Sequence, residues 1–412
     1  MNICKSTVIL FIIINFTGIS QTGNSWGISL SGFVKTDVFY DSRETVSLRE
    51  GHFNLYPAKE KVDINGDVIN KEAAFNILSI QTRIAGKITA PDVLGAKTSG
   101  LIEGAFFGHT EGDINGFRLR HAFVRLDWES TSLLVGQFWH PMFIHESFPE
   151  VVSFNTGAPF QPFSRNPQIR IMQRFGGLEL IATAASQRDF TSAGPDTKDP
   201  KLTVANSSYL RNSGLPIMNF QFKYKYETLL FGAGINYTTL KPRLVTEKNY
   251  KVSESVKSTA FNAFAKFSHG DFSIRLEGVY GQNLYDLAML GGYAVESRDT
   301  TTGAAVYTNI KSMSSWIDIS YGKEFKVGVF GGFAKNLGAD NDFSGPVYAR
   351  GSDIDRLVRI SPRLVYSINK VQFAGEFEYT GAYYGKINSK GKVENAELIA
   401  NTRVLIAAYL FF

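Results

Sequence analysis

The chain has 412 residues, of which 44% are hydrophobic and 13% aromatic, and its formal net charge is +5. A bundle of membrane helices is excluded, because each such helix needs about 20 nearly uncharged apolar residues. The small charge excess is spread along the chain, without the Lys/Arg blocks that are typical of nucleic-acid binding. Abundant aromatic residues and glycine, with little Pro or Cys, favour a chain built from β-strands and tight turns.

Residues 1–20 have the pattern of a secretory signal peptide. Met1–Lys5 carries one positive charge, residues 8–16 form the apolar run VILFIIINF, and small residues follow up to Ser20. This order predicts cleavage after Ser20 and a mature chain of residues 21–412. A short membrane anchor is the alternative, although the apolar run is too short to cross a bilayer comfortably.

From Gly27 to Phe412 the sequence alternates between apolar and polar residues with a period of two, which is typical of strands. We predict one domain with sixteen strands, at 27–40, 74–90, 99–108, 116–129, 132–139, 167–176, 178–188, 217–227, 229–241, 257–269, 272–283, 313–322, 325–335, 354–368, 371–384 and 400–412. Most are longer than strands of globular proteins, which average about five or six residues. Their length instead suits a tilted strand that crosses a bilayer, which needs about 9–11 residues.

The connections between the strands alternate between short and long. Short turns include 176–177, 227–228, 269–271, 322–324 and 369–370, and long loops include 41–73, 140–166, 189–216, 284–312 and 336–353. A soluble sandwich has no reason to gather its long loops at one end, whereas a membrane barrel has short periplasmic turns and long extracellular loops. The sequence therefore predicts an all-β fold, a transmembrane antiparallel up-and-down β-barrel of about 16 strands. The alternatives are fourteen or eighteen strands, if a long loop such as 41–73 differs from this assignment.

Each predicted strand has one apolar and one polar face. In Met218–Tyr226 the aromatic residues at even positions alternate with Asn219, Gln221, Lys223 and Lys225. In a membrane barrel the apolar face meets lipid and the polar face lines water. Strand length and the aromatic residues near strand ends favour this arrangement over a soluble sandwich. The chain also ends in an aromatic residue, Phe412, directly after a long strand, as bacterial outer-membrane barrels do.

The segment Phe117–His140, FRLRHAFVRLDWESTSLLVGQFWH, resembles the general porins of Gram-negative bacteria, and most of all the DcaP-like porins. It combines an Arg-rich strand, a tight turn and a strand that ends in residues 136–139, GQFW. The resemblance implies a homotrimer in the outer membrane and a passive channel for small, often anionic, solutes. It also implies that the third loop, 140–166, folds into the lumen. Some relatives carry an N-terminal coiled coil, and this chain has no heptads there.

Strand parity predicts which charged residues line the lumen and select solutes. The predicted basic residues are Lys35, Arg83, Lys87, Arg125, Arg170, Arg174, Lys223, Arg275, Arg359 and Arg363. The predicted acids are Asp37, Glu103, Glu277, Asp318, Glu376 and Glu378. Arcs of opposite charge across the lumen would create a transverse field, and the basic excess would favour anions. Any single residue of these sets can equally be an ordinary solvated lumen residue.

Four further charged residues belong to neither of these predicted lumen sets. Glu146 and Glu150 of the third loop are expected to face the basic wall, with His140 and His145 nearby. Arg118 and Arg120 share the parity of residues 124, 126 and 128, which are apolar. They are therefore predicted to lie above the apolar belt or at a subunit contact.

The predicted function is that of an outer-membrane porin for passive diffusion of small hydrophilic solutes, with a preference for anions. No enzyme activity, cofactor, metal or nucleic-acid partner is expected. The only cysteine, Cys4, precedes the mature chain, His140 and His145 lack the HExxH spacing, and no GxSxG elbow surrounds Ser147. The alternatives are a non-conducting barrel that acts as an adhesin or complex partner, and an outer-membrane hydrolase.

Overall fold

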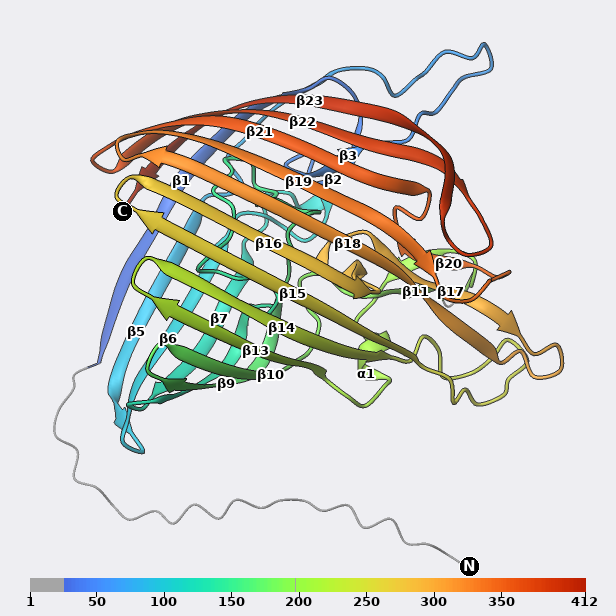
Figure 1. The fold of residues 1–412 in the computed structure, drawn as a ribbon, viewed down its shortest axis with the longest axis horizontal. Helices are drawn as coiled ribbons and strands as arrows, with labels where there is room; N and C mark the ends of the chain where they lie inside the picture. Colours follow the sequence, from blue (N-terminus) through green and yellow to red (C-terminus); the bar gives the residue numbers. More distant parts are fainter. Residues whose placement is uncertain (1–25, 197) are drawn as a thin grey trace, which may run out of the picture.

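A computed structural model describes residues 26–196 and 198–412. The predicted signal peptide, its cleavage site and Cys4 lie outside the described residues. Within the described residues, antiparallel strands form a closed barrel of 16 membrane-spanning segments (Figure 1). No helix in these ranges is both long and apolar enough to cross a bilayer. The predicted fold class is confirmed.

In chain order the barrel strands are β1 (Gly27–Asp41), β4 (Ala74–Leu78), β5 (Arg83–Val93), β6 (Ala96–Ala105), β7 (Arg118–Asp127), β8 (Thr131–Trp139), β9 (Arg165–Phe175), β10 (Leu178–Ala185), β13 (Ile217–Tyr226), β14 (Leu229–Leu240), β15 (Val256–His269), β16 (Phe272–Gln282), β18 (Ala305–Gly322), β19 (Phe325–Ala339), β21 (Ile354–Ile368), β22 (Val371–Ile387) and β23 (Val393–Phe411). β4 and β5 together form one spanning segment. The long loops add β2 (Thr45–Leu48), β3 (Phe53–Pro57), β11 (Ala193–Pro195), β12 (Thr203–Ala205), β17 (Gly291–Arg298), β20 (Val347–Arg350), α1 (Ser208–Arg211) and the 3-10 turns η1 (Glu111–Asp113) and η2 (Tyr285–Leu287).

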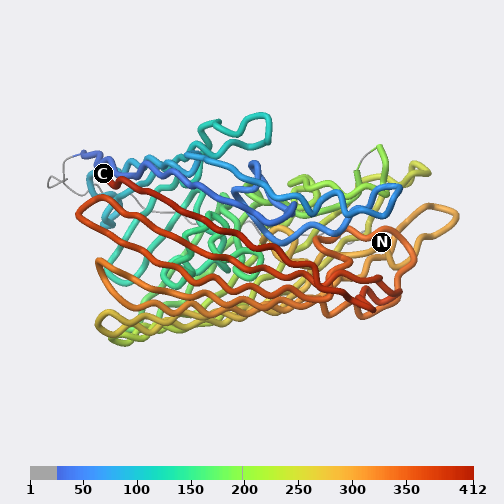
Figure 2. The backbone as a smooth tube through the Cα atoms, turned by 90° about the horizontal axis from the view of Figure 1, so that it is seen from above, coloured from blue at the N-terminus to red at the C-terminus, as the bar shows by residue number. Residues whose placement is uncertain are grey.

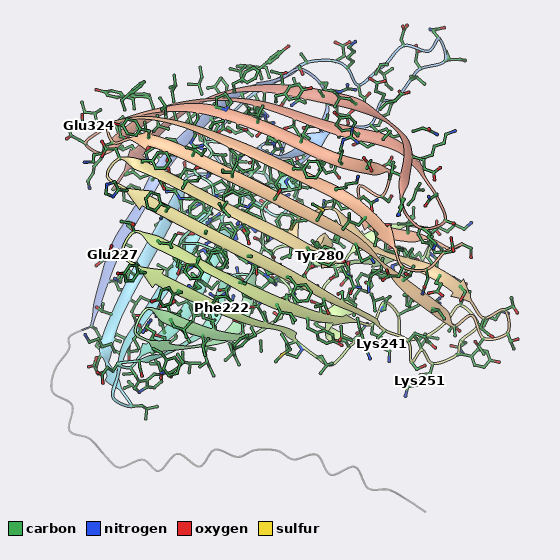
Figure 3. All side chains as sticks on the ribbon, viewed as in Figure 1. Phe222, Glu227, Lys241, Lys251, Tyr280 and Glu324 are labelled. Atoms are coloured by element: carbon green, nitrogen blue, oxygen red, sulfur yellow. The ribbon has the colours of Figure 1, made fainter. Side chains whose placement is uncertain are left out.

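The barrel closes because β1 has partners along both of its edges. It pairs with β23 from Phe33 to Asp41 on one side, and with β4 and β5 on the other. Closure leaves no unpaired strand edge, as hydrocarbon requires, because backbone groups cannot bond to water there. Short turns gather at one end of the barrel, where Figure 3 places Glu227 and Glu324, and Lys241 and Lys251 lie at the loop end. Glu227 and Asn369 have φ of 46° and 53°, the left-handed conformation that tight hairpin turns require.

The predicted strand 74–90 is the one that the structure interrupts. Residues 79–82 separate β4 from β5, although both pair with β1. The irregularity turns Ile80 and Gln81 toward the lumen, where Ile80 is buried and the Gln81 amide oxygen accepts a hydrogen bond from the Lys35 ammonium. A local break of this kind re-aims side chains without ending the strand pairing.

Loops fill part of the barrel interior. The third loop lies inside the ring of strands, as the blue-green part of the trace in Figure 2 shows. Phe53 and Leu55 of β3 pack with Phe143, Phe154, Phe160 and Phe163 of this loop in one apolar core. Wall residues such as Phe330 and Leu357 complete that core. The outer surface is also apolar, and Phe222 and Tyr280 are exposed on it (Figure 3).

Candidate functional site

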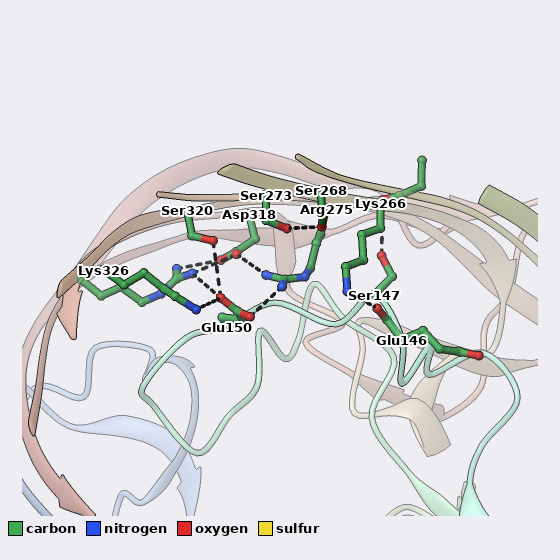
Figure 4. Close-up of polar contacts among 12 residues, drawn as sticks. Glu146, Ser147, Glu150, Lys266, Ser268, Ser273, Arg275, Asp318, Ser320 and Lys326 are labelled. Atoms are coloured by element: carbon green, nitrogen blue, oxygen red, sulfur yellow. Dashed lines mark hydrogen bonds and ion pairs between the residues drawn. The ribbon is translucent and has the colours of Figure 1, made fainter. Parts of the chain in front are cut away.

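The third loop crosses the lumen and is held by its acidic residues against the wall made by β13, β15 and β16. Glu146 Oε1 lies 2.5 Å from Lys223 Nζ, and Lys266 Nζ donates to the Glu146 carbonyl oxygen at 3.1 Å. The Ser147 hydroxyl donates to the carbonyl oxygen of Ala265 at 3.3 Å (Figure 4). One end of the loop is therefore fixed by contacts to β13 and β15, which are separated by β14.

Glu150 is the centre of a second set of contacts. Its carboxylate lies 2.6 Å from Arg275 Nη2, 3.2 Å from Lys326 Nζ and 4.0 Å from Arg363 Nη2. Asp318 binds both guanidinium groups from the wall side, at 2.7 Å from Arg363 and 3.5 Å from Arg275 (Figure 4). Burial by itself raises the pKa of Glu150, but Arg275 and Lys326 outweigh it and lower the pKa to about 2.

The far end of the loop binds β21 and β22. The backbone N–H of Val152 donates to Glu376 at 2.6 Å, and the Asn155 amide donates to Glu378 at 2.9 Å. Arg359 Nη1 donates to the Ala158 carbonyl oxygen at 2.7 Å. The predicted acids Glu376 and Glu378 thus hold the loop, rather than facing open solvent.

A hairpin formed by β2 and β3 of the first loop also enters the lumen, and it was not predicted from the sequence. Arg359 Nη2 donates to the Leu55 carbonyl oxygen at 2.6 Å, and the His52 ring lies 2.8 Å from Asp37. Arg403 of β23, also missed, is fully buried and contacts Asp41 at 2.5 Å and the Gly51 carbonyl oxygen at 2.7 Å. The only sequence signal was the alternation in TVSL and FNLYP, which is too short to show where a hairpin lies.

Five of the predicted basic residues hold these loops, namely Lys35, Lys223, Arg275, Arg359 and Arg363. Besides Arg275, Arg359 and Arg363, Lys35 is fully buried and binds Asp37 at 2.9 Å and the Val152 carbonyl oxygen at 2.9 Å. Lys35 and Asp37 lie on β1, Arg275 and Asp318 lie on neighbouring strands, and Arg363 and Asp318 have only β19 between them. The expected arcs of opposite charge facing each other across the lumen are therefore wrong for these pairs, because direct pairing satisfies buried charges better than separation does.

The wall from β5 to β10 carries the remaining predicted bases. Arg125 contacts Asp127 at 2.8 Å, Arg174 contacts Glu179 at 3.2 Å, and Arg83 lies 3.7 Å from Glu103. Arg170 makes no ion pair in the part of the chain that the structure describes. It donates to Gln168 and to the Trp139 carbonyl oxygen, over the ring of Phe138. Lys87 is exposed on the same strand as Arg83.

The prediction that Arg118 and Arg120 share the outward parity of residues 124, 126 and 128, above the apolar belt or at a subunit contact, is wrong. Glu103 of β6 pairs with His121, but the next residue, Gly104, pairs with Leu119, so Arg120 is an extra residue in a β-bulge. The bulge changes the parity of β7, and both arginines become buried. Arg120 binds Glu103 at 2.7 Å, and Arg118 pairs with Asp189 of the fourth loop.

A cavity of about 380 Å³ remains between the third loop and this wall. The wall contributes Arg83, Glu103, Arg120 and His121, and the other lining residues include aromatic side chains of β8 and the third loop, Trp139, Phe143, Phe148 and Phe154. We call this space the throat. A second cavity of about 450 Å³ near the turn end is lined by Lys223, Lys225 and Lys266 together with Glu146 and Glu179. The throat has more basic than acidic side chains in its lining, whereas the second cavity, which Glu227 also lines, has three lysines and three glutamates.

The histidines and Ser147 show no enzyme-like arrangement within the described residues. No group of three His, Cys, Asp or Glu residues there is placed to hold a metal. His140 Nδ1 accepts the backbone N–H of Met142 at 3.2 Å, and His145 Nδ1 lies 3.2 Å from Glu146. The hydroxyl of Ser147 donates a hydrogen bond to a backbone carbonyl oxygen. A serine nucleophile would instead donate its hydrogen bond to the side chain that acts as its general base.

No protein-family model matches the sequence, and comparison with curated proteins gives no match either. The fold does match solved structures. The outer membrane channel DcaP of Acinetobacter baumannii aligns with a TM-score of 0.69 and 17% identity, over 95% of this chain and 99% of that one. The anion-selective porin from Comamonas acidovorans aligns with a TM-score of 0.54 and 13% identity, over 94% of this chain and 100% of that one. OmpT of Vibrio cholerae, an outer membrane protein, aligns with a TM-score of 0.55 and 10% identity, over 95% of this chain and 99% of that one. The chain therefore has the fold of the outer-membrane porins of Gram-negative bacteria.

Proposed function

We propose that the chain is an outer-membrane porin through which small hydrophilic solutes diffuse passively, with a preference for anions. The observation that carries the proposal is the division of charge around the third loop. Its acids, Glu146 and Glu150, are paired with Lys223, Arg275 and Lys326 of one wall. The loop therefore brings no free acid to the opposite wall, which is rich in arginine. Fixed cations along a narrow aqueous path raise the local concentration of anions.

Support for a channel also comes from the fold. The solved structures that it matches include a channel and an anion-selective porin, and one OmpT structure is described as a trimer form. We propose the same trimeric assembly here. The aromatic and arginine lining of the throat would narrow the path and exclude large solutes. The likeness to channels and porins favours transport over the alternatives of an adhesin and a hydrolase.

Planar bilayers test the proposal. The purified protein should give ohmic single-channel steps, and in a salt gradient the reversal potential should have the sign of anion preference. Arg170→Ala should move the reversal potential toward zero, because Arg170 is one of the basic residues of this wall that have no ion-pair partner among the described residues. Lys61→Ala, an exposed loop residue, is the matched control and should leave it unchanged. Absence of conductance would support an adhesin or complex partner, and cation preference would contradict the assigned selectivity.

A further inference from the structure

The carboxylate of Asp189 is shared by two arginines at the loop end of the barrel wall. Asp189 Oδ2 lies 2.7 Å from Arg165 Nη2 and accepts a hydrogen bond from Arg165 Nε at 2.8 Å, and Oδ1 pairs with Arg118. Arg118 and Arg165 are the first residues of β7 and β9, so both stand where these strands meet the loops. Because arginine stays protonated in proteins, the single acid leaves one positive charge of this group uncancelled. We call the three residues the loop-end triad.

The loop-end triad is almost completely removed from solvent. The side chains of Arg165 and Asp189 are 3% and 2% exposed, and that of Arg118 is 10% exposed. Nη1 of Arg165 is buried and has no hydrogen-bond acceptor among the described residues. Buried charges are screened by salt much less than charges in open water. The field of the uncancelled charge therefore extends to the neighbouring part of the lumen.

The triad lies directly behind the aromatic lining of the throat. The guanidinium group of Arg165 lies 5.0 Å from the ring centre of Trp139 and 5.5 Å from that of Phe163. Both of these rings line the throat. Arg120, which itself lines the throat, lies 5.9 Å from the same Trp139 ring. An anion in the throat is thus separated from Arg165 by one layer of aromatic side chains.

Asp189 comes from the fourth loop, whereas both arginines belong to barrel strands. The backbone N–H of Asp189 donates to the carbonyl oxygen of Arg165 at 3.3 Å, and the N–H of Arg188 donates to Asn166 Oδ1 at 3.0 Å. These contacts hold the beginning of the loop against β9 and keep the carboxylate in one place. The fourth loop therefore provides the arginine pair with a fixed counter-charge.

We propose that Asp189 is a specificity-determining residue of the channel, which limits the preference for anions by cancelling one of the two arginine charges behind Trp139. The inference rests on the proposed function, because it concerns selectivity in the same lumen. At low salt, a unit charge about 10 Å from a permeating ion changes the concentration of that ion about twofold, and the anion-to-cation ratio about two- to fourfold. The competing explanation is that Asp189 only anchors the fourth loop, which would change loop mobility but not ion preference.

Reversal potentials in planar bilayers, with about 0.1 M and 0.01 M KCl on the two sides, test the proposal. Asp189→Asn should raise the chloride-to-potassium permeability ratio about two- to fourfold. Arg118→Gln should lower the ratio, because it removes the uncancelled charge. The double variant R118Q/D189N removes one charge of each sign and should return the ratio to the wild-type value. Asp199→Asn, which removes an exposed acid of the same loop, is the control and should leave the ratio unchanged.

Glu103→Gln shows whether the measurement detects one charge. Glu103 lines the throat itself and contacts Arg120 at 2.7 Å, so its neutralisation should shift the ratio toward chloride. A shift in this variant without a shift in Asp189→Asn would overturn the proposal. Limited proteolysis of residues 189–216 tests the competing explanation. Faster cleavage in Asp189→Asn with an unchanged permeability ratio would show that Asp189 only anchors the loop.

The double variant gives a further decisive result. If its permeability ratio departed from the wild-type value as far as that of Asp189→Asn, selectivity would not follow the net charge of the triad, and the proposal would be wrong. The proposed function is tested separately by the wild-type protein. Cation preference of the wild-type channel would contradict that function, whereas a shift toward chloride in Asp189→Asn would still support the role of Asp189.

Discussion

Individual charged residues hold the loops of the lumen against the barrel wall. Glu150 contacts Arg275 and Lys326 and lies near Arg363, and its removal would leave several cations without their shared partner. Arg359 joins both loops to the wall through carbonyl oxygens at 2.7 and 2.6 Å. Breaking buried contacts of this kind costs on the order of 3 kcal/mol, because a charge or a carbonyl oxygen remains unpaired.

Glu150→Gln should loosen the third loop. The neutral amide keeps the shape of the carboxylate but loses its attraction to Arg275 and Lys326. We expect noisier open-channel current and faster proteolysis within residues 140–164, with the barrel still folded. Glu72→Gln, at an exposed loop residue, is the control. Identical noise and proteolysis in both variants would mean that Glu150 does not hold the loop.

The pKa of Glu150, lowered to about 2, sets a pH window for the same contact. A carboxyl whose pKa is depressed in the docked loop stabilises docking fully above its ordinary pKa of 4.5, and loses this contribution as the pH falls toward 2. Single-channel noise of the wild-type protein should therefore stay constant from pH 7 to about 5 and rise progressively as the pH falls from about 4.5 toward 2. A rise centred between pH 6 and 7 would indicate another titrating group.

Arg359→Ala should affect conductance rather than selectivity, in contrast to Arg170→Ala. Arg359 is buried and donates hydrogen bonds to the carbonyl oxygens of Leu55 and Ala158, and it is not one of the residues that line the throat. We expect a larger and more variable single-channel conductance with a nearly unchanged reversal potential. A clear loss of anion preference in this variant would show that Arg359 faces the permeating ions directly.

Among the elements, the β2–β3 hairpin is the one that most reduces the open lumen besides the third loop. Every residue of β3 is buried, and the hairpin packs against β22 and β23 and against the aromatic core of the third loop. A barrel of this size is otherwise wide enough for an aqueous channel. The hairpin and the third loop together therefore define the path that remains.

Replacing residues 45–57 by a short Gly/Ser linker should raise single-channel conductance several-fold and admit larger solutes. The matched control shortens residues 62–68, a loop tip with an isolated bridge between Val62 and Val68 and a fully exposed Ile64. Both deletions remove a loop segment, but only the first removes groups from the lumen. Conductance that is unchanged by the first deletion would show that the hairpin does not limit the path.

For the whole molecule, selectivity is an electrostatic property and should depend on salt. Charges of the arginine-rich wall act over about 30 Å at 0.01 M salt but only about 3 Å at 1 M salt. The anion preference, measured as a permeability ratio from reversal potentials at constant concentration ratio, should therefore fall as mean ionic strength rises. A preference that stays constant across this range would point to size or dehydration instead of fixed charge.

The strands, their two faces and the alternation of turns and loops follow from the sequence alone. Each depends on local spacing, since side chains alternate along a strand and tight turns need few residue types. The sequence also placed Arg83, Arg125, Arg170 and Arg174 on the polar face. The remaining features depend on contacts between residues that are far apart in the sequence. The bulge at Arg120 is visible only in the pairing of β6 with β7, and the contact of Arg359 with Leu55 joins residues 304 positions apart. Such long-range contacts determine which charged residues form ion pairs or hydrogen bonds with the loops and which remain unpaired. The periodicity of the sequence gives no information about these contacts.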